Sequence, residues 1–135
     1  MQHLAFISRP VLNALMHGYK RVECRLSRNA HPAGSARPGD ELLFKVVAGG
    51  VELYAMVEAV EHYDNLQDGD VQTLAEMYAD VAFDIPGMDI GKYLASKRDA
   101  RYVSFLWLTD LCALHISKER LPTSRTGWIA DWPPA

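Results

Sequence analysis

The chain has 135 residues, of which 49% are hydrophobic and 23% charged, and its formal net charge is −3. This composition is typical of one globular domain, and no apolar run reaches the roughly 20 residues that a membrane-spanning helix needs. The N-terminal stretch also lacks the basic start and the apolar length of a signal peptide. We therefore expect a single cytoplasmic domain over residues 1–135, without a membrane partner.

Cysteine and histidine positions argue against a disulfide framework and a metal site. Cys24 and Cys112 are far apart and lie within apolar segments, which predicts two reduced and mostly buried thiols. The five histidines show neither an HxxxH pattern nor a Cys/His cluster. We expect neither a metal nor another cofactor.

The charges are distributed unevenly along the chain. Residues 1–50 hold seven Lys or Arg against three Asp or Glu, whereas residues 51–95 hold one against ten. This asymmetry allows one local basic surface or pocket. It excludes the broad cationic face that non-specific binding of duplex nucleic acid requires.

The first quarter of the chain predicts a strand, a helix and a second strand. Residues 2–7 alternate in polarity, and a helix follows with Pro10 in its first turn and Gly18 just past its end. The second strand covers residues 20–26. Its two-residue period separates Val22, Cys24 and Leu26 on one face from Arg21, Glu23 and Arg25 on the other.

The rest of the chain predicts further strands with helices inserted among them. Residues 27–39 read as a loop, followed by a hairpin of strands over 41–47 and 51–62. A helix is expected over 68–82, with its inward face formed by Val71, Leu74, Met77, Tyr78 and Val81. The remaining expected elements are a helix over 90–97, a central strand over 102–109, its partner strand over 111–116, and a short strand within 127–132. The pattern indicates a mixed α+β barrel.

Two motifs in the first third carry a family resemblance. Residues 18–25 read Gly-x-Lys-x-x-Glu-x-Arg, and residues 38–44 read Pro-Gly-Asp-x-Leu-x-Phe. Together with the strand and helix before them, these motifs resemble the ASCH domain of the PUA-like superfamily, over roughly residues 8–60. The resemblance implies an α+β fold, namely a PUA-like mixed β-barrel with a helix after the first strand and peripheral inserted helices.

The charged group Lys20, Glu23 and Arg25 is the strongest candidate site. Ionisable residues on an internal strand must face solvent, pair with each other or line a cleft. Glu23 and Arg25 share a strand face, so a simple ion pair is the structural alternative to a functional role. Lys20 has the opposite parity, and it joins them only if the strand start twists or bulges.

The resemblance implies a cleft beside the barrel that family members use for RNA or a nucleobase. Basic side chains would complement phosphate charge there, the candidates being Arg9, Lys20, Arg21, Arg25 and Arg28. Glu23 would accept an N–H group from a base edge. The candidate stacking faces are Tyr19, Tyr102 and Trp107. The first functional hypothesis is therefore an RNA-binding or nucleoside-binding domain, with RNA or a modified nucleobase as its partner.

Two enzymes on the same fold are the alternative hypotheses. Some small ASCH proteins are amidohydrolases that act on N4-acetylcytidine. Their pattern has a Lys at the position that Lys20 occupies here, a Thr three residues later, and a Glu further downstream. Here Glu23 stands in the Thr position, and the downstream candidates are Glu58, Glu61 and Glu76. The resemblance also extends to ribonucleases that combine Tyr, Lys and Ser, in which Ser104 would take the Ser role. This chain lacks the expected Tyr, so the ribonuclease ranks third.

Overall fold

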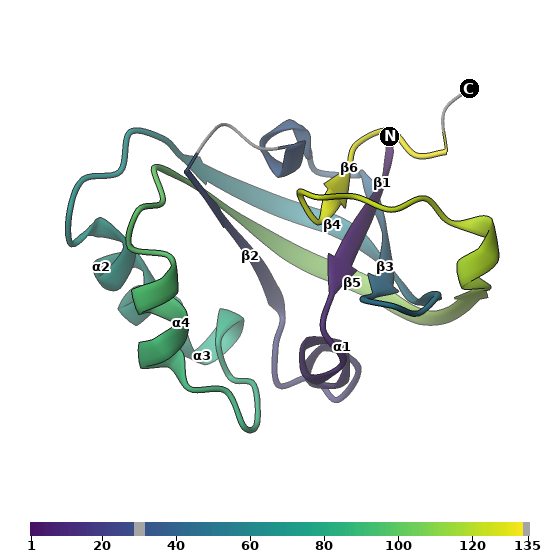
Figure 1. The fold of residues 1–135 in the computed structure, drawn as a ribbon, viewed down its shortest axis with the longest axis horizontal. Helices are drawn as coiled ribbons and strands as arrows, with labels where there is room; N and C mark the ends of the chain where they lie inside the picture. Colours follow the sequence, from purple (N-terminus) through teal and green to yellow (C-terminus); the bar gives the residue numbers. More distant parts are fainter. Residues whose placement is uncertain (29–31, 134–135) are drawn as a thin grey trace.

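The computed structural model describes residues 1–28 and 32–133. Six strands form one mixed sheet in the order β2-β5-β4-β3-β1-β6, and the sheet curls into a half-barrel (Figure 1). Only β1 and β3 run parallel, and the other neighbouring pairs are antiparallel. The strands are β1 (Gln2–Ile7), β2 (Val22–Ser27), β3 (Glu41–Val46), β4 (Val51–Tyr63), β5 (Tyr102–Ile116) and β6 (Trp128–Ile129). The helices are α1 (Arg9–Met16), α2 (Asp70–Met77), α3 (Ala79–Ala82) and α4 (Ile90–Ser96), with 3-10 turns η1 (Pro32–Ser35) and η2 (Lys118–Arg120).

The order of the first elements confirms the sequence prediction. Ser8 is the N-cap of α1, Pro10 lies in its first turn, and Gly18 follows its end with a left-handed φ of +79°. The strand β2 begins two residues later than predicted, because main-chain hydrogen bonds hold the preceding residues elsewhere. Lys20 N–H bonds the Ala14 carbonyl at 3.2 Å, and Arg21 N–H bonds the Val81 carbonyl at 2.8 Å. Residues 29–31 of the predicted loop lie outside the described residues.

The strand β5 corrects one prediction. Residues 111–116 are not a hairpin partner of residues 102–109, because the two segments form a single strand of 15 residues. Asp110 adopts a left-handed φ of +54°, which bends the strand without reversing it. The partner of both halves is β4, whose 13 residues pair with β5 through three shifts of register. Long paired strands with such irregularities are how a sheet curls.

The helix predicted over residues 68–82 is also corrected. It divides into α2 and α3 at Tyr78, whose φ of −109° and ψ of 14° are not helical. The Tyr78 ring packs against Phe105 on β5, with ring centroids 4.1 Å apart. Met77, the last residue of α2, points outward and is 67% exposed instead of facing the core.

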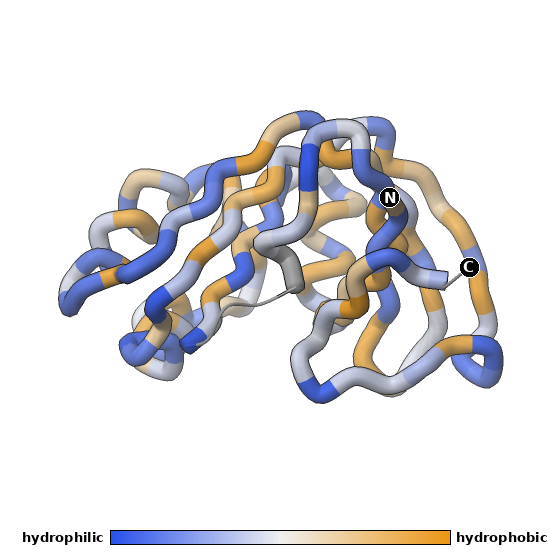
Figure 2. The backbone as a smooth tube through the Cα atoms, turned by 90° about the horizontal axis from the view of Figure 1, so that it is seen from above, coloured by the Kyte–Doolittle hydropathy of each residue, from blue (hydrophilic) through white to orange (hydrophobic). Residues whose placement is uncertain are grey.

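The core lies on both faces of the sheet. Inside the half-barrel, Leu12 and Leu15 of α1 pack against side chains of β1, β3, β4 and β5, including Phe44 and Leu106. On the outer face, α2, α3 and α4 cover β2 and the first half of β5. Cys24 is buried in this outer layer, but Cys112 is exposed, which corrects the expectation for the second thiol. Hydrophobic segments run along the strands and hydrophilic ones occupy many of the turns (Figure 2).

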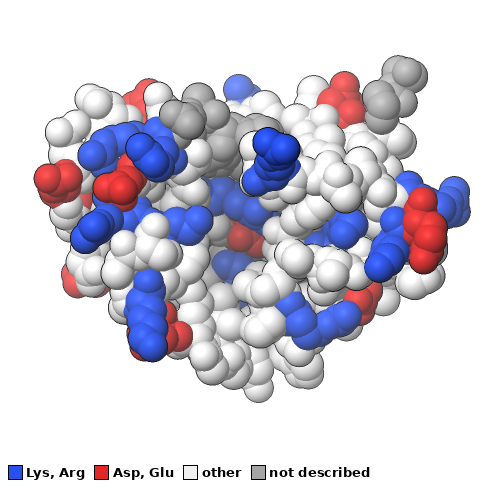
Figure 3. Space-filling model, in the orientation of Figure 1, with Lys and Arg blue, Asp and Glu red and all other residues white. Residues whose placement is uncertain are grey.

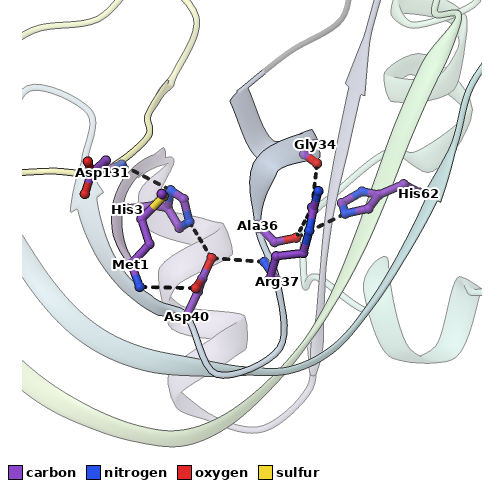
Figure 4. A network of polar contacts seen from close by, with 8 residues as sticks. All are labelled: Met1, His3, Gly34, Ala36, Arg37, Asp40, His62 and Asp131. Carbon is purple, nitrogen blue, oxygen red and sulfur yellow. Dashed lines mark hydrogen bonds and ion pairs between the residues drawn. The ribbon is translucent and has the colours of Figure 1, made fainter.

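A buried polar network ties three distant segments together (Figure 4). Asp40, in the turn before β3, accepts hydrogen bonds from the ring of His3 at 2.8 Å and from Arg37 N–H at 3.0 Å. Because His3 Nδ1 accepts the Asp131 N–H at 3.4 Å, its Nε2 must carry the proton given to Asp40. The network holds β1, the 37–40 turn and the C-terminal segment in place.

Within 1–28 and 32–133, none of the helices is long and apolar enough to cross a membrane. In that part of the chain, no three His, Cys, Asp or Glu side chains come together as metal ligands would.

Candidate functional site

A cleft of about 380 Å³ lies between β1 and β2, on the side of the half-barrel where these strands face each other without pairing. Figure 3 shows a hollow on this face of the molecule, with basic and acidic side chains inside it. The cleft wall comes from β1, the start of α1, β2, α4 and the segment before β6. Its volume falls within the range of small-ligand pockets.

Glu23 and Arg25 project from β2 toward the inside of the half-barrel. In the pairing of β2 with β5, Glu23 lies opposite Leu106 and Arg25 lies opposite Ser104. Leu106 belongs to the inner core. Their shared face is the one that strand parity predicted. The two side chains form the ion pair that the sequence offered as the structural alternative to a functional role, with 3.5 Å between Arg25 Nε and Glu23 Oε1.

Arg25 bridges the two walls of the cleft. Its Nη1 donates to the Gly127 carbonyl at 3.2 Å, and its Nη2 donates to the Phe6 carbonyl at 3.0 Å. The guanidinium also lies 5.4 Å from the ring of Trp128. A planar guanidinium with several fixed donors suits such a bridge better than a lysine would. Arg25 therefore contributes positive charge to the cleft, and its two Nη groups fix the position of the opposite wall.

Two buried polar atoms in the cleft wall have no partner. Glu23 is 5% exposed and Trp128 is 2% exposed. Among residues 1–28 and 32–133, neither Glu23 Oε2 nor Trp128 Nε1 has a hydrogen-bond partner. Native proteins leave few such groups unsatisfied, because each costs about 1–3 kcal/mol. Both residues line the cleft, so one acceptor and one donor without a described partner belong to its wall.

Helix α4 supplies the outer wall with Tyr93 and Lys97. Burial raises the pKa of the Tyr93 hydroxyl well above its usual range, so this group is a neutral donor at physiological pH. Burial likewise raises the pKa of the neighbouring Cys24 thiol to about 12. Lys97 is half-buried, with its Nζ 5.9 Å from the Tyr93 ring. The α4 wall is therefore aromatic with a single cation.

Lys20 does not line this cleft. It is 4% exposed, and its Nζ donates to the Ala82 carbonyl at 2.7 Å, with the Phe83 ring 6.0 Å away. Since Lys20 precedes β2, its side chain turns toward α3 on the outer face. No described carboxylate lies within ion-pair distance of it in residues 1–28 and 32–133. The structure therefore does not bring Lys20 and Glu23 together.

Three other predicted binding residues lie near α1 and its end, outside the cleft. Arg9 makes a two-pronged ion pair with Glu52, with both N–O distances 2.7 Å, which raises the pKa of Arg9. Tyr19 is half exposed and stacks on His17, with ring centroids 6.1 Å apart. Arg21 is exposed on the surface.

The predicted residues on β5 also lie apart from the cleft. Ser104 is buried and hydrogen-bonded to His62 Nδ1 at 2.8 Å, and His62 Nε2 donates to the Ala36 carbonyl at 3.2 Å. Tyr102 and Ser104 line a second pocket of about 350 Å³ with His62. Trp107 lies on the outer face and packs edge-on against Tyr78.

Several residues that line the cleft were not among the site residues predicted from the sequence. They are Ser8, Tyr93, Lys97, Thr126 and Trp128. No local signal identifies these side chains, because packing brings them into one cleft from segments far apart in the chain.

Comparisons with known proteins bear on the fold. No protein-family model and no curated protein sequence matches this chain. Among solved structures, the ASCH protein from Zymomonas mobilis superposes with a TM-score of 0.69 at 17% identity, covering 95% of this chain and 85% of that one. A serine-to-alanine variant of that protein gives 0.66 at 21% identity, over 95% and 86% of the two chains. The hypothetical protein PH0355 gives 0.58 at 16% identity, over 84% and 100%.

At identities this low, the structural similarity establishes the fold but does not transfer the role of any residue. The superposition covers 95% of this chain, so it includes the six-stranded mixed sheet and the helix after the first strand. The chain therefore has the α+β fold of ASCH proteins, as the motifs in its first third implied.

Proposed function

We propose that this chain binds a nucleobase, free or within RNA, in the cleft between β1 and β2. The observation that supports the proposal is the pair of buried polar atoms in the cleft wall, Glu23 Oε2 and Trp128 Nε1. A ligand that satisfies both must present an N–H donor and an acceptor. The ASCH-type fold makes an RNA-related ligand the leading class.

The chemistry of a base edge matches these two groups. A carboxylate only accepts hydrogen bonds and an indole N–H only donates them. Nucleobases carry ring or amino N–H groups beside carbonyl oxygens or bare ring nitrogens. Phe6 and Tyr93 add aromatic surface to the same cleft, and stacking on such surface is a common way to hold an unpaired base. Because the site is sheltered from water, each hydrogen bond in it is stronger than at the surface.

The test of this proposal is Glu23→Gln. The variant keeps the shape of the side chain but replaces one acceptor oxygen by an amino group, so it should bind nucleosides and short single-stranded RNA roughly 10- to 100-fold more weakly. Calorimetry and thermal shift with the ribonucleosides, N4-acetylcytidine and a short RNA measure the effect, since a ligand that binds only the folded chain raises its melting temperature.

Glu58→Gln is the matched control, because Glu58 is exposed on β4 and lies outside the cleft. Trp128→Phe keeps an aromatic ring and removes the N–H donor, and it should weaken binding several-fold. If Glu23→Gln binds as tightly as the unaltered chain, or if no ligand in the panel binds, the proposal is wrong.

The amidohydrolase hypothesis gains no support from the geometry. Lys20 is directed onto the Ala82 carbonyl, and none of the three downstream glutamates considered for it lines the cleft. The hypothesis stays open to a direct test with N4-acetylcytidine. Release of cytidine that disappears in Lys20→Ala would favour the hydrolase over a binding domain. The ribonuclease hypothesis, with Ser104 paired to His62, likewise stays a prediction.

A further inference from the structure

The N-terminus of α1 opens onto the same cleft. Ser8 and Val11 both line the cleft, and Ser8 is the N-cap of this eight-residue helix. Its hydroxyl makes no capping hydrogen bond, and the first turn contains no acidic residue. The first intrahelical bond runs from Leu12 N–H to the Ser8 carbonyl, so the earlier N–H groups have no partner inside the helix. Such an end attracts anions through its N–H groups and its dipole.

The cationic side chains around the cleft leave a positive excess. Lys97 lines the wall formed by α4, and no described carboxylate in residues 1–28 and 32–133 lies within ion-pair distance of it. Arg25 adds a second cation, and Glu23 is the only carboxylate among the described lining residues. Arg9 does not add to this positive charge, because its guanidinium is paired with the Glu52 carboxylate. A neutral nucleoside would leave the excess uncompensated.

A second observation indicates a ligand in this cleft independently of the helix end. Glu23 Oε2 and Trp128 Nε1 belong to side chains more than nine-tenths buried, and they have no partner in the described part of the chain. One cleft therefore combines a donor and an acceptor suited to a base edge with a helix end and a lysine suited to an anion. Its volume of about 380 Å³ is in the size class of a small-ligand site.

We propose that the ligand is a nucleotide, and that the N-terminus of α1, the Ser8 hydroxyl and Lys97 form its phosphate subsite. The proposal rests on the proposed function and specifies the ligand further. A phosphate oxygen accepts hydrogen bonds from main-chain N–H groups and hydroxyls, and it pairs with an ammonium group. The phosphate can belong to a free mononucleotide or to an RNA strand, and both share this chemistry.

Calorimetry with matched ligands tests the subsite. The panel contains the four ribonucleosides, their 5′- and 3′-monophosphates, inorganic phosphate and a single-stranded tetranucleotide of RNA. A monophosphate should bind roughly 10-fold or more tightly than its nucleoside, because charge-assisted hydrogen bonds are about twice as strong as neutral ones. Tighter binding of the tetranucleotide than of every mononucleotide would identify RNA as the source of the phosphate, and the reverse order would identify free nucleotides.

Two variants act on the subsite without touching Glu23. Ser8→Asp keeps a good N-cap, so the helix stays formed, but its carboxylate repels a phosphate. Lys97→Ala removes the cation. Each should lower the ratio of monophosphate to nucleoside affinity by roughly 3- to 10-fold. The matched controls are Asn13→Asp on α1 and Lys92→Ala on α4, both exposed and outside the cleft, and they should leave the ratio unchanged.

The outcomes separate this inference from the proposed function. If nucleosides and monophosphates bind equally, or if Ser8→Asp and Lys97→Ala leave the ratio unchanged, the phosphate subsite is wrong. The base site then stands by itself, provided that Glu23→Gln still weakens nucleoside binding. If inorganic phosphate binds and is lost in Ser8→Asp while Glu23→Gln changes nothing, the subsite stands and the base site is wrong.

Discussion

Lys20 and Glu23 are three residues apart in the chain, and burial gives them different roles. Lys20 is buried beside α3, and its Nζ donates a hydrogen bond to the Ala82 carbonyl. This bond ties the start of β2 to the outer helices. Glu23 is buried on the other face of the sheet, and its Oε2 has no hydrogen-bond partner in residues 1–28 and 32–133. A buried charge is costly unless it is paired or hydrogen-bonded. If the proposed base site exists, Glu23 is therefore the residue whose hydrogen bond with the base should contribute most.

Asp40 is the residue at which stability should depend on pH. Burial by itself would raise the pKa of Asp40, but hydrogen bonds from His3, from Arg37 N–H and from the terminal ammonium of Met1 outweigh it and lower the pKa. In the unfolded chain this carboxyl has an ordinary pKa of about 3.9. Its contribution to stability is therefore complete above about pH 4, and it is lost as the pH falls through the lower, folded value.

Asp40→Asn tests this dependence. The variant should be less stable than the unaltered chain at neutral pH, and the gap should close as the pH falls below about 4. Urea unfolding across a series of pH values measures both curves. Asp99→Asn is the control, because Asp99 is exposed and should leave the pH dependence unchanged. Parallel curves for the unaltered chain and Asp40→Asn would contradict the assignment.

At the scale of elements, β5 determines the curvature of the sheet. It stays paired with β4 on both sides of Asp110, so the chain bends there and the two halves of one strand reach different parts of the half-barrel. An aspartate tolerates the left-handed conformation better than a β-branched residue does. The bend therefore has a sequence requirement at one exposed position.

Substitutions at Asp110 test the bend. Asp110→Val should lower the free energy of unfolding by roughly 1–2 kcal/mol, because a β-branched side chain is strained at a φ of +54°. Asp110→Gly should retain the stability of the unaltered chain or slightly exceed it. Glu58→Val is the control, being an exposed position on β4 where a β-branched residue suits an extended strand. Equal stability of Asp110→Val and Asp110→Gly in urea unfolding would rule out the explanation.

At the scale of the whole molecule, Arg25 closes the half-barrel. The strands β1 and β2 do not pair, and the guanidinium joins them through the carbonyls of Phe6 and Gly127. The same guanidinium also ties β2 to the segment that leads into β6. The cleft wall is therefore held at a set width by one side chain.

Arg25→Lys tests this bridge. Lysine keeps the charge but cannot reach both carbonyls in a planar fork, so unfolding should become easier by roughly 2–4 kcal/mol. Urea unfolding measures the loss, and hydrogen exchange should show faster exchange in residues 126–129. Arg28→Lys, at an exposed position at the end of β2, serves as the comparison. A change within about 0.5 kcal/mol, the usual range for a surface substitution, would show that Arg25 does not close the barrel.

The sequence by itself determined the local features of this protein. Turn residues and periodicity located β1 and α1, and the two-residue period placed Glu23 and Arg25 on one strand face. These features depend on sterics within a few neighbouring residues, which is why a single chain reveals them. The motifs around Gly18 and Gly39 were sufficient to indicate the ASCH-type fold.

Only the tertiary structure decided what faces those residues. Gly127 lies 102 positions from Arg25, and Ala82 lies 62 positions from Lys20, yet each pair is in hydrogen-bond contact. The rest of the cleft wall, with Trp128 and Lys97, is likewise assembled from remote segments. Local periodicity has no information about such contacts, because they depend on how the helices pack on the curled sheet. The sequence predicted the face of Glu23, and packing made that face a cleft.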